Sequence, residues 1–175
     1  IGKQDHYAAA FGGMNLFCFK PDGRVTVEHQ WLREGLVQSL FDHVLMFWTR
    51  IRRDAASVLA EQQRNTVAKL DVLRAMRDDA RSLHELLRNG FDPLRFGVVL
   101  DRTWSLKRQL ASGITNERID TWYARARSAG AVGGKICGAG GGGFLLLVLR
   151  PERRQAVQEA LADLDEVPIG YEAQG

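Results

Sequence analysis

The stretch that decides the fold is GGKICGAGGGGF at positions 133–144, which runs directly into the apolar segment Phe144–Leu149. More than half of its positions are glycine, and glycine loses much chain entropy on folding, so it marks backbone that turns sharply or approaches a partner closely. The pattern G-x-G-x-x-G occurs at Gly138, Gly140 and Gly143, but a dinucleotide-binding fingerprint follows a strand and opens a helix. Here a helix is predicted before the glycines and a strand after them. We therefore expect another kind of phosphate or substrate loop, or a site of close backbone packing.

The order of elements around this stretch predicts an α+β fold, with a mostly antiparallel sheet and helices packed on one face. A short helix over 3–11 precedes a hairpin whose strands are expected at 15–19 and 24–29. A further strand is expected at 43–49. Apolar periodicity and capping signals then predict helices over 54–66, 69–88, 93–111 and 116–129. After the glycines we expect a strand at 144–149, a helix over 152–164 and a last short strand at 167–171.

The composition predicts one domain over residues 1–175, because 45% hydrophobic residues suffice for a core. No run approaches the ~18 apolar residues of a membrane span, so no membrane partner is expected. The two cysteines, Cys18 and Cys137, have no framework spacing, and no signal peptide is visible, which favours a cytoplasmic location. The net charge of the chain is only +3, and its arginines are interspersed with acidic residues along the predicted helices. We therefore expect no nucleic-acid partner. The histidines have no metal-ligand spacing, so no metal site is predicted.

Two segments together resemble the GHMP kinase superfamily: GKQDHYAAAFGG at positions 2–13 and GGKICGAGGGGF at 133–144. Within that family the chain is most similar to the sugar kinases that act on D-glycero-D-manno-heptose 7-phosphate, over nearly its whole length. The resemblance implies the fold of the family's C-terminal domain. It also implies ATP-dependent phosphorylation, with Mg²⁺, of the anomeric hydroxyl of the heptose 7-phosphate to give the 1,7-bisphosphate.

The resemblance implies a catalytic role for Asp5, which occupies the position of the aspartate that faces the acceptor hydroxyl. A carboxylate there accepts the hydroxyl proton or orients the hydroxyl, and phosphoryl transfer needs mainly positioning and charge stabilisation. The alternative is that Asp5 is only an acid in a first helical turn, favoured by the helix dipole. With both family motifs present, we expect the catalytic role.

Five polar residues are candidates for binding the substrate: Lys3, Gln4, Thr49, Arg52 and Lys135. Lys3 and Gln4 flank the aspartate, and Lys135 offers a point charge inside the glycine-rich segment. Thr49 and Arg52 end a predicted strand, where an arginine fork suits a phosphate group. For each of the five, ordinary solvated surface polarity is the alternative.

The glycines of the loop are expected to let backbone N–H groups approach the substrate or a neighbouring phosphate loop. These glycines are Gly138, Gly140, Gly141, Gly142 and Gly143. The alternative is tight packing of the loop against the opening helix, and both can hold together.

Kinases of this family also carry an N-terminal domain whose P-x-x-x-G-L-G-S-S-A type loop surrounds the ATP phosphates at a helix start. No such loop occurs in this chain, so we expect a C-terminal portion that binds ATP and Mg²⁺ weakly or not at all and is inactive alone. Two alternatives stay open. One is a fucokinase- or galactokinase-like enzyme whose acceptor lacks the distal phosphate, and the other is a non-catalytic binding module of the same fold. A homodimer is compatible with the sequence.

Overall fold

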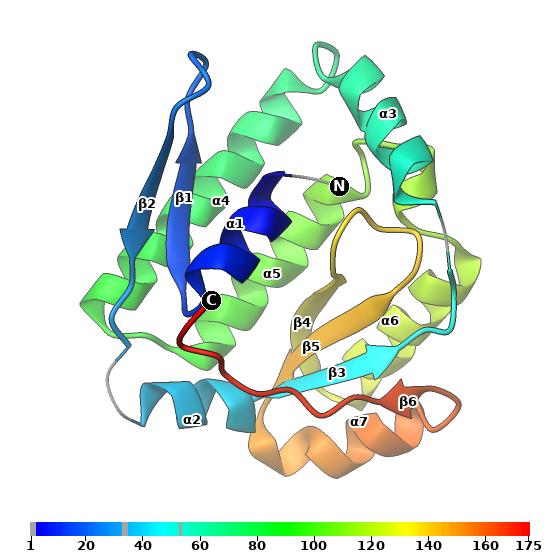
Figure 1. Cartoon of the computed structure of the whole chain (residues 1–175). Helices are drawn as coiled ribbons and strands as arrows, with labels where there is room; N and C mark the ends of the chain where they lie inside the picture. Colours follow the sequence, from blue (N-terminus) through cyan, green and yellow to red (C-terminus); the bar gives the residue numbers. More distant parts are fainter. Residues whose placement is uncertain (1–2, 33–34, 53) are drawn as a thin grey trace.

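The computed structural model describes residues 3–32, 35–52 and 54–175 as a mixture of helices and antiparallel strands (Figure 1). The helices are α1 (Lys3–Phe11), α2 (Leu36–Asp42), α3 (Ala55–Asn65), α4 (Leu70–Asn89), α5 (Pro93–Lys107), α6 (Glu117–Ala129) and α7 (Arg154–Ala160). The strands are β1 (Asn15–Phe19), β2 (Val25–His29), β3 (Val44–Trp48), β4 (Ala131–Ile136), β5 (Phe144–Leu149) and β6 (Asp165–Glu166). Among the described residues, no helix is both long and apolar enough to cross a membrane.

The strands form two separate antiparallel sheets. The hairpin β1–β2 stands alone, with Phe17 opposite Val27, whereas the larger sheet has the order β4-β5-β3-β6. Each neighbouring pair in the larger sheet is antiparallel. Strand β3 lies between β5 and β6, which both come far later in the chain. The expected α+β class and the antiparallel pairing are confirmed.

The main core lies between the larger sheet and helices α6 and α7. Leu145, Leu147 and Leu149 of β5 are fully buried and share a cluster with residues of α6 and α7 such as Trp122 and Val157. Alternate residues of a strand point to opposite faces. The opposite face of β5 is covered by α5, which also carries Leu100 into a second cluster, so helices lie on both faces and not only on the one expected.

Helix α5 crosses the sheet at two glycines, one on each element. A Cβ at Gly133 of β4 would lie only 1.9 Å from the carbonyl oxygen of Gly97 of α5, and a Cβ at Gly97 would lie 3.0 Å from Cβ of Val148. Glycine inside a helix costs about 1 kcal/mol relative to alanine, so its presence there calls for a packing reason. The reason is that the backbone of α5 rests directly on the backbone of β4.

The structure differs from the sequence-based expectations in three elements: β4, α2 and the last strand. Residues 133–136 belong to strand β4 although they were expected to lie in a continuous glycine-rich loop, because pairing with β5 overrides the low strand propensity of Gly133 and Gly134. Helix α2 was not predicted. The predicted strand at 167–171 is wrong, since β6 covers Asp165–Glu166 and pairs with Phe47 and Trp48.

The C-terminal segment returns to the first helix. The N–H of Gly13 donates to the carbonyl of Glu172 over 2.7 Å, and Figure 1 shows the C-terminus beside the end of α1. Gly12 and Gly13 both have positive φ, a conformation that glycine adopts without steric cost. The GG pair therefore ends α1 and lets the tail pack closely against it.

Candidate functional site

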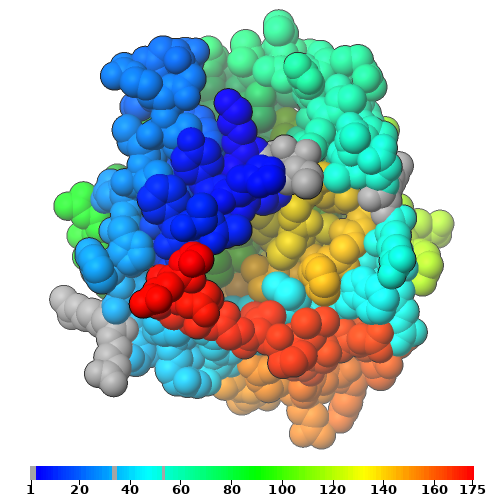
Figure 2. Space-filling view, viewed as in Figure 1, coloured from blue at the N-terminus to red at the C-terminus, as the bar shows by residue number. Residues whose placement is uncertain are grey.

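A cavity of about 730 Å³ lies where α1, the β1–β2 hairpin, helices α3–α5 and the glycine loop converge. The two segments that carry the family resemblance both contribute to it. Figure 2 shows the yellow glycine loop at the surface between the blue α1 and the turquoise α3. The lining residues are Lys3, Gln4, Asp5, Phe19, Lys20, Gly23, Ala55, Leu59, Gln62, Leu73, Met76, Thr103, Trp104, Lys107, Leu110, Lys135, Gly138 and Ala139.

Lysines supply almost all the charge of this cavity. The sequence has five lysines and nineteen arginines, yet four of the lysines, Lys3, Lys20, Lys107 and Lys135, line the cavity, while none of the arginines in the described ranges does. The only carboxylate among the described lining residues is that of Asp5. The cavity is therefore strongly cationic although the whole chain carries a net charge of only +3. Such a cavity attracts an anion.

The arginines, by contrast, are largely paired on the surface. Nη2 of Arg108 lies 2.9 Å from Oδ2 of Asp120, and Nη2 of Arg125 lies 2.9 Å from Oδ1 of Asp163. Within the described part of the chain, no ion pair of 4.0 Å or less joins any of the four cavity lysines to a carboxylate. Among the described residues, the lysine charges are thus left without a carboxylate at ion-pair distance.

Lys107, at the end of α5, and Lys20, in the turn of the hairpin, are the two cavity lysines that the sequence analysis missed. The Nζ of Lys107 donates a hydrogen bond to the carbonyl oxygen of Gly138. Burial, followed by repulsion from Lys135, lowers the pKa of Lys107 to about 8, while Cys137 and Asp5 act in the opposite direction. A lysine in a last helical turn is ordinarily explained by the helix dipole, so no local signal distinguished it.

The titration of Lys107 gives a direct test of this cluster. In the 175-residue chain, the ¹³Cε resonance of Lys107 should titrate with a pKa near 8. Lys135→Met removes a like charge and should raise that pKa, whereas Asp5→Asn removes an opposite charge and should lower it. A Lys107 pKa that moves in neither variant would contradict the arrangement of the three groups.

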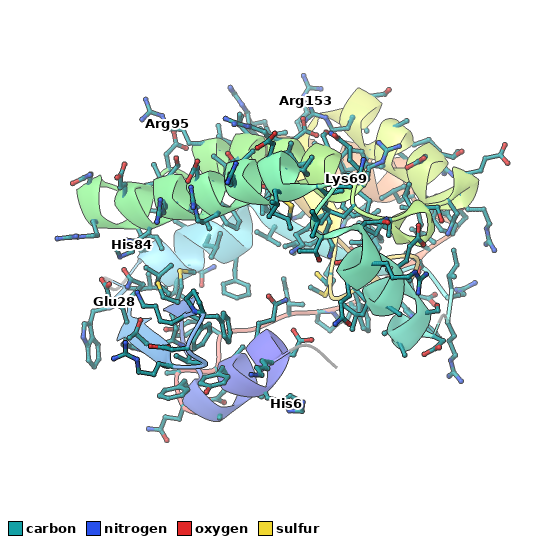
Figure 3. All side chains as sticks on the ribbon, turned by 90° about the horizontal axis from the view of Figure 1, so that it is seen from above. His6, Glu28, Lys69, His84, Arg95 and Arg153 are labelled. Carbon is teal, nitrogen blue, oxygen red and sulfur yellow. The ribbon has the colours of Figure 1, made fainter. Side chains whose placement is uncertain are left out.

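Asp5 lies in the first turn of α1 and lines the cavity with its neighbours Lys3 and Gln4. Their side chains are exposed, and the interaction with Lys107 places the Asp5 carboxylate within electrostatic range of the cationic wall. Figure 3 shows His6 on the side of α1 that faces away from α4 and α5. The placement of Asp5 suits the predicted contact with an acceptor hydroxyl, and its catalytic role stays a prediction.

Thr49 and Arg52 do not line the cavity. Thr49 is fully buried, and its hydroxyl donates to the carbonyl oxygen of Gly143 over 2.8 Å, so it fastens the end of the glycine loop to β3. Arg52 is exposed. The structure therefore brings together Lys3, Gln4 and Lys135 from the predicted binding set, but not these two residues.

The glycine loop packs mainly on the protein itself. The N–H of Gly141 donates to the carbonyl of Ile114 over 2.6 Å, and that of Gly143 donates to the carbonyl of Ile51 over 3.0 Å. A Cβ at Gly142 would lie 2.4 Å from the Ile51 carbonyl oxygen. Close packing thus explains the glycines in this part of the loop. These contacts are with the segments around residues 51 and 114, whereas packing against the opening helix had been expected.

Gly138 is the loop glycine that lines the cavity. Its φ is +70°, and a Cβ there would meet no heavy atom within 4 Å. Backbone that is both open and free of a side chain can be approached closely by a ligand. The neighbouring Cys137 is partly buried, and burial raises the pKa of its thiol, so the thiol is neutral near pH 7 and unsuited to nucleophilic attack.

Residues 72–166 match the protein family described as GHMP kinases C terminal. The chain is 29% identical over 164 residues to D-glycero-alpha-D-manno-heptose 7-phosphate kinase of Campylobacter jejuni, which covers 91% of this chain and 48% of that protein. It is 26% identical to L-fucokinase/L-fucose-1-P guanylyltransferase of Bacteroides fragilis, covering 93% of this chain and 18% of that protein. The chain thus spans about half the length of the first of these relatives, and less of the second.

Among solved structures, a Campylobacter jejuni protein assigned as a sugar kinase superposes with a TM-score of 0.73. The two sequences are 28% identical, and the match covers 99% of this chain and 50% of that one. The likeness therefore extends over the whole described fold, including α1 and the hairpin that border the cavity.

Proposed function

Because the chain belongs to the GHMP kinases, as the C-terminal domain of that family, we propose that it is the acceptor-binding portion of a sugar kinase. The proposed reaction transfers the γ-phosphoryl group of ATP to the anomeric hydroxyl of D-glycero-D-manno-heptose 7-phosphate. The observation that carries the proposal is that Asp5, Lys135 and Gly138, from two motifs far apart in the sequence, line one cavity.

In the proposed reaction Asp5 acts on the acceptor. The anomeric oxygen forms a bond to the γ-phosphorus, the bond from that phosphorus to the β–γ bridging oxygen breaks, and the hydroxyl proton passes to the Asp5 carboxylate. ADP leaves with the bridging oxygen. The lysines around the cavity offset the negative charge that the acceptor and the transferred group bring together.

The second substrate, Mg-ATP, fits this chain only in part. Lysine ammonium groups suit phosphate oxygens, but Mg²⁺ requires several oxygen ligands, and among the described lining residues Asp5 is the one carboxylate. We propose that the nucleotide and its metal ion are held mainly by an N-terminal portion of a longer kinase to which this chain belongs. The 175-residue chain alone should therefore show no turnover.

The Bacteroides fragilis relative supports a second candidate. Its name describes a fucokinase, so a neutral sugar is the alternative acceptor. The cationic lining favours the phosphorylated acceptor, because a neutral sugar gives the four lysines no counter-charge.

The proposal is tested by ADP release from the polypeptide encoded by this reading frame together with the codons upstream of Ile1. With Mg-ATP and D-glycero-D-manno-heptose 7-phosphate we expect turnover, and with L-fucose much less. Turnover with L-fucose alone would replace the heptose proposal with the fucokinase alternative. The absence of ADP release with any sugar would leave only a non-catalytic binding module.

A further inference from the structure

The distribution of charge around the cavity calls for a specific ligand group. Lys107 and Lys135 both line the cavity, and repulsion from Lys135 contributes to the lowered pKa of Lys107. Neither lysine is paired with a carboxylate at 4.0 Å or less within the described residues. Like charges held together without a counter-ion cost free energy, which an anion bound between them recovers. The Asp5 carboxylate offsets only part of this charge.

Resting on the proposed sugar-kinase function, we propose that Lys107 and Lys135 together bind the phosphate group that the acceptor already carries. Lys107 is thereby a specificity-determining residue. It selects a phosphorylated sugar over a neutral one, while Asp5 acts on the hydroxyl to be phosphorylated.

The local geometry suits a phosphate. The Lys107 ammonium has three donors, of which one is used by the Gly138 carbonyl, so two stay available to phosphate oxygens. Gly138 has open space where a Cβ would stand, which lets a bulky anion approach the backbone beside Lys107. Cys137, the nearby thiol, is neutral and does not repel it.

The packing of the fold holds this pair in place. Gly97 and Gly133 set α5 directly on β4, Lys135 follows two residues after Gly133, and Lys107 lies ten residues after Gly97. Ten helical residues span about 15 Å, so the glycine contact fixes how far along α5 the backbone of Lys107 lies from the crossing with β4. The helix-on-strand contact at these glycines therefore helps to hold the two lysines at the same cavity.

Nucleotide phosphates share this chemistry, so the experiment compares the two sources. The 175-residue chain is titrated, with NMR chemical shifts as the readout, against D-glycero-D-manno-heptose 7-phosphate, the unphosphorylated heptose and Mg-ADP. We expect the phosphorylated heptose to bind about tenfold or more tightly than the neutral one, since hydrogen bonds to charged groups contribute that much. Its affinity should fall as the pH rises above about 8, because neutral Lys107 no longer attracts the phosphate.

Lys107→Met should remove most of the preference for the phosphorylated heptose, and it should weaken the binding of heptose 7-phosphate more than the weak binding of Mg-ADP. Lys135→Met is a second variant expected to act in the same way. Lys69→Met is the matched control, because Lys69 is the one lysine outside the cavity lining (Figure 3), and it should keep the full preference.

Three results would overturn the inference. The first is equal affinity of the unmodified chain for the two heptoses. The second is an undiminished preference for heptose 7-phosphate in both Lys107→Met and Lys135→Met. The third is that these variants lose Mg-ADP binding but still bind heptose 7-phosphate. If the two heptoses bind equally and the longer protein still turns over sugar, the sugar-kinase function stands and only the role of the lysines fails. If neither heptose binds and no sugar is turned over, both proposals fail.

Discussion

Asp5→Asn in the longer kinase is expected to lower kcat by about 10²–10⁴-fold, the usual contribution of a positioned acid–base group. The amide keeps the size and the hydrogen-bonding reach of the carboxylate but cannot take up the hydroxyl proton. Because Asp5 is exposed on α1, the folded state should change little. The measurement is steady-state ADP release with Mg-ATP and heptose 7-phosphate, alongside a urea unfolding curve.

The matched control is Asp71→Asn, which removes an exposed acid from the first turn of α4. Each substitution weakens a favourable interaction with a helix dipole, which is worth at most about 1 kcal/mol. Only Asp5→Asn should affect turnover. If the two variants lose the same small amount of stability and neither loses turnover, Asp5 is only an acid in the first turn of a helix.

Gly133→Ala is expected to cost about 3 kcal/mol or more in the free energy of unfolding, beyond the usual range for overpacking. The new Cβ would lie 1.9 Å from the carbonyl oxygen of Gly97, and a backbone oxygen cannot move aside as a flexible side chain can. Helix α5 would have to lift from β4, which would expose the face of the sheet that carries Val148. Urea denaturation of the 175-residue chain, followed by circular dichroism, measures the effect.

Two further alanine substitutions are controls, against which the loss of unfolding free energy in Gly133→Ala is compared. At Gly97 the new Cβ would lie 3.0 Å from Val148 side-chain atoms, so Gly97→Ala should cost less than Gly133→Ala. At Gly170 it would meet nothing within 4 Å, and Gly170→Ala should be neutral or stabilising by up to about 1 kcal/mol, because alanine restricts the unfolded chain. Equal stability of all three variants would show that α5 does not rest on β4 as described.

Much of the fold is accessible from local pattern. The cap at Asn116, whose side chain accepts from the N–H of Ile119 over 3.1 Å, and the periodic helix that became α4 were predicted because their signals lie within a few residues of each other. Strand β4 was not predicted, because a glycine-rich strand has almost no local sequence signal and forms only because β5 pairs with it. The last strand was misplaced for a similar reason: a two-residue strand is defined by its partner β3.

The candidate site divides in the same way. Asp5, Lys3, Gln4 and Lys135 were found from motifs, and the structure places all four around one cavity. Thr49 was chosen as a polar residue at a strand end, but its hydroxyl is buried in a hydrogen bond to the glycine loop.

The sequence by itself determined most of the element types, the two motifs and the carboxylate at Asp5, because each depends on residues adjacent in the chain or on a resemblance that the letters carry. Only the tertiary structure decided that four of the five lysines line one cavity and that Lys107 lies within electrostatic range of Lys135. These lysines come from α1, the hairpin, α5 and β4. What a side chain faces across elements depends on how backbones pack, here on two glycines that meet at the crossing of α5 and β4, and no local period encodes that contact.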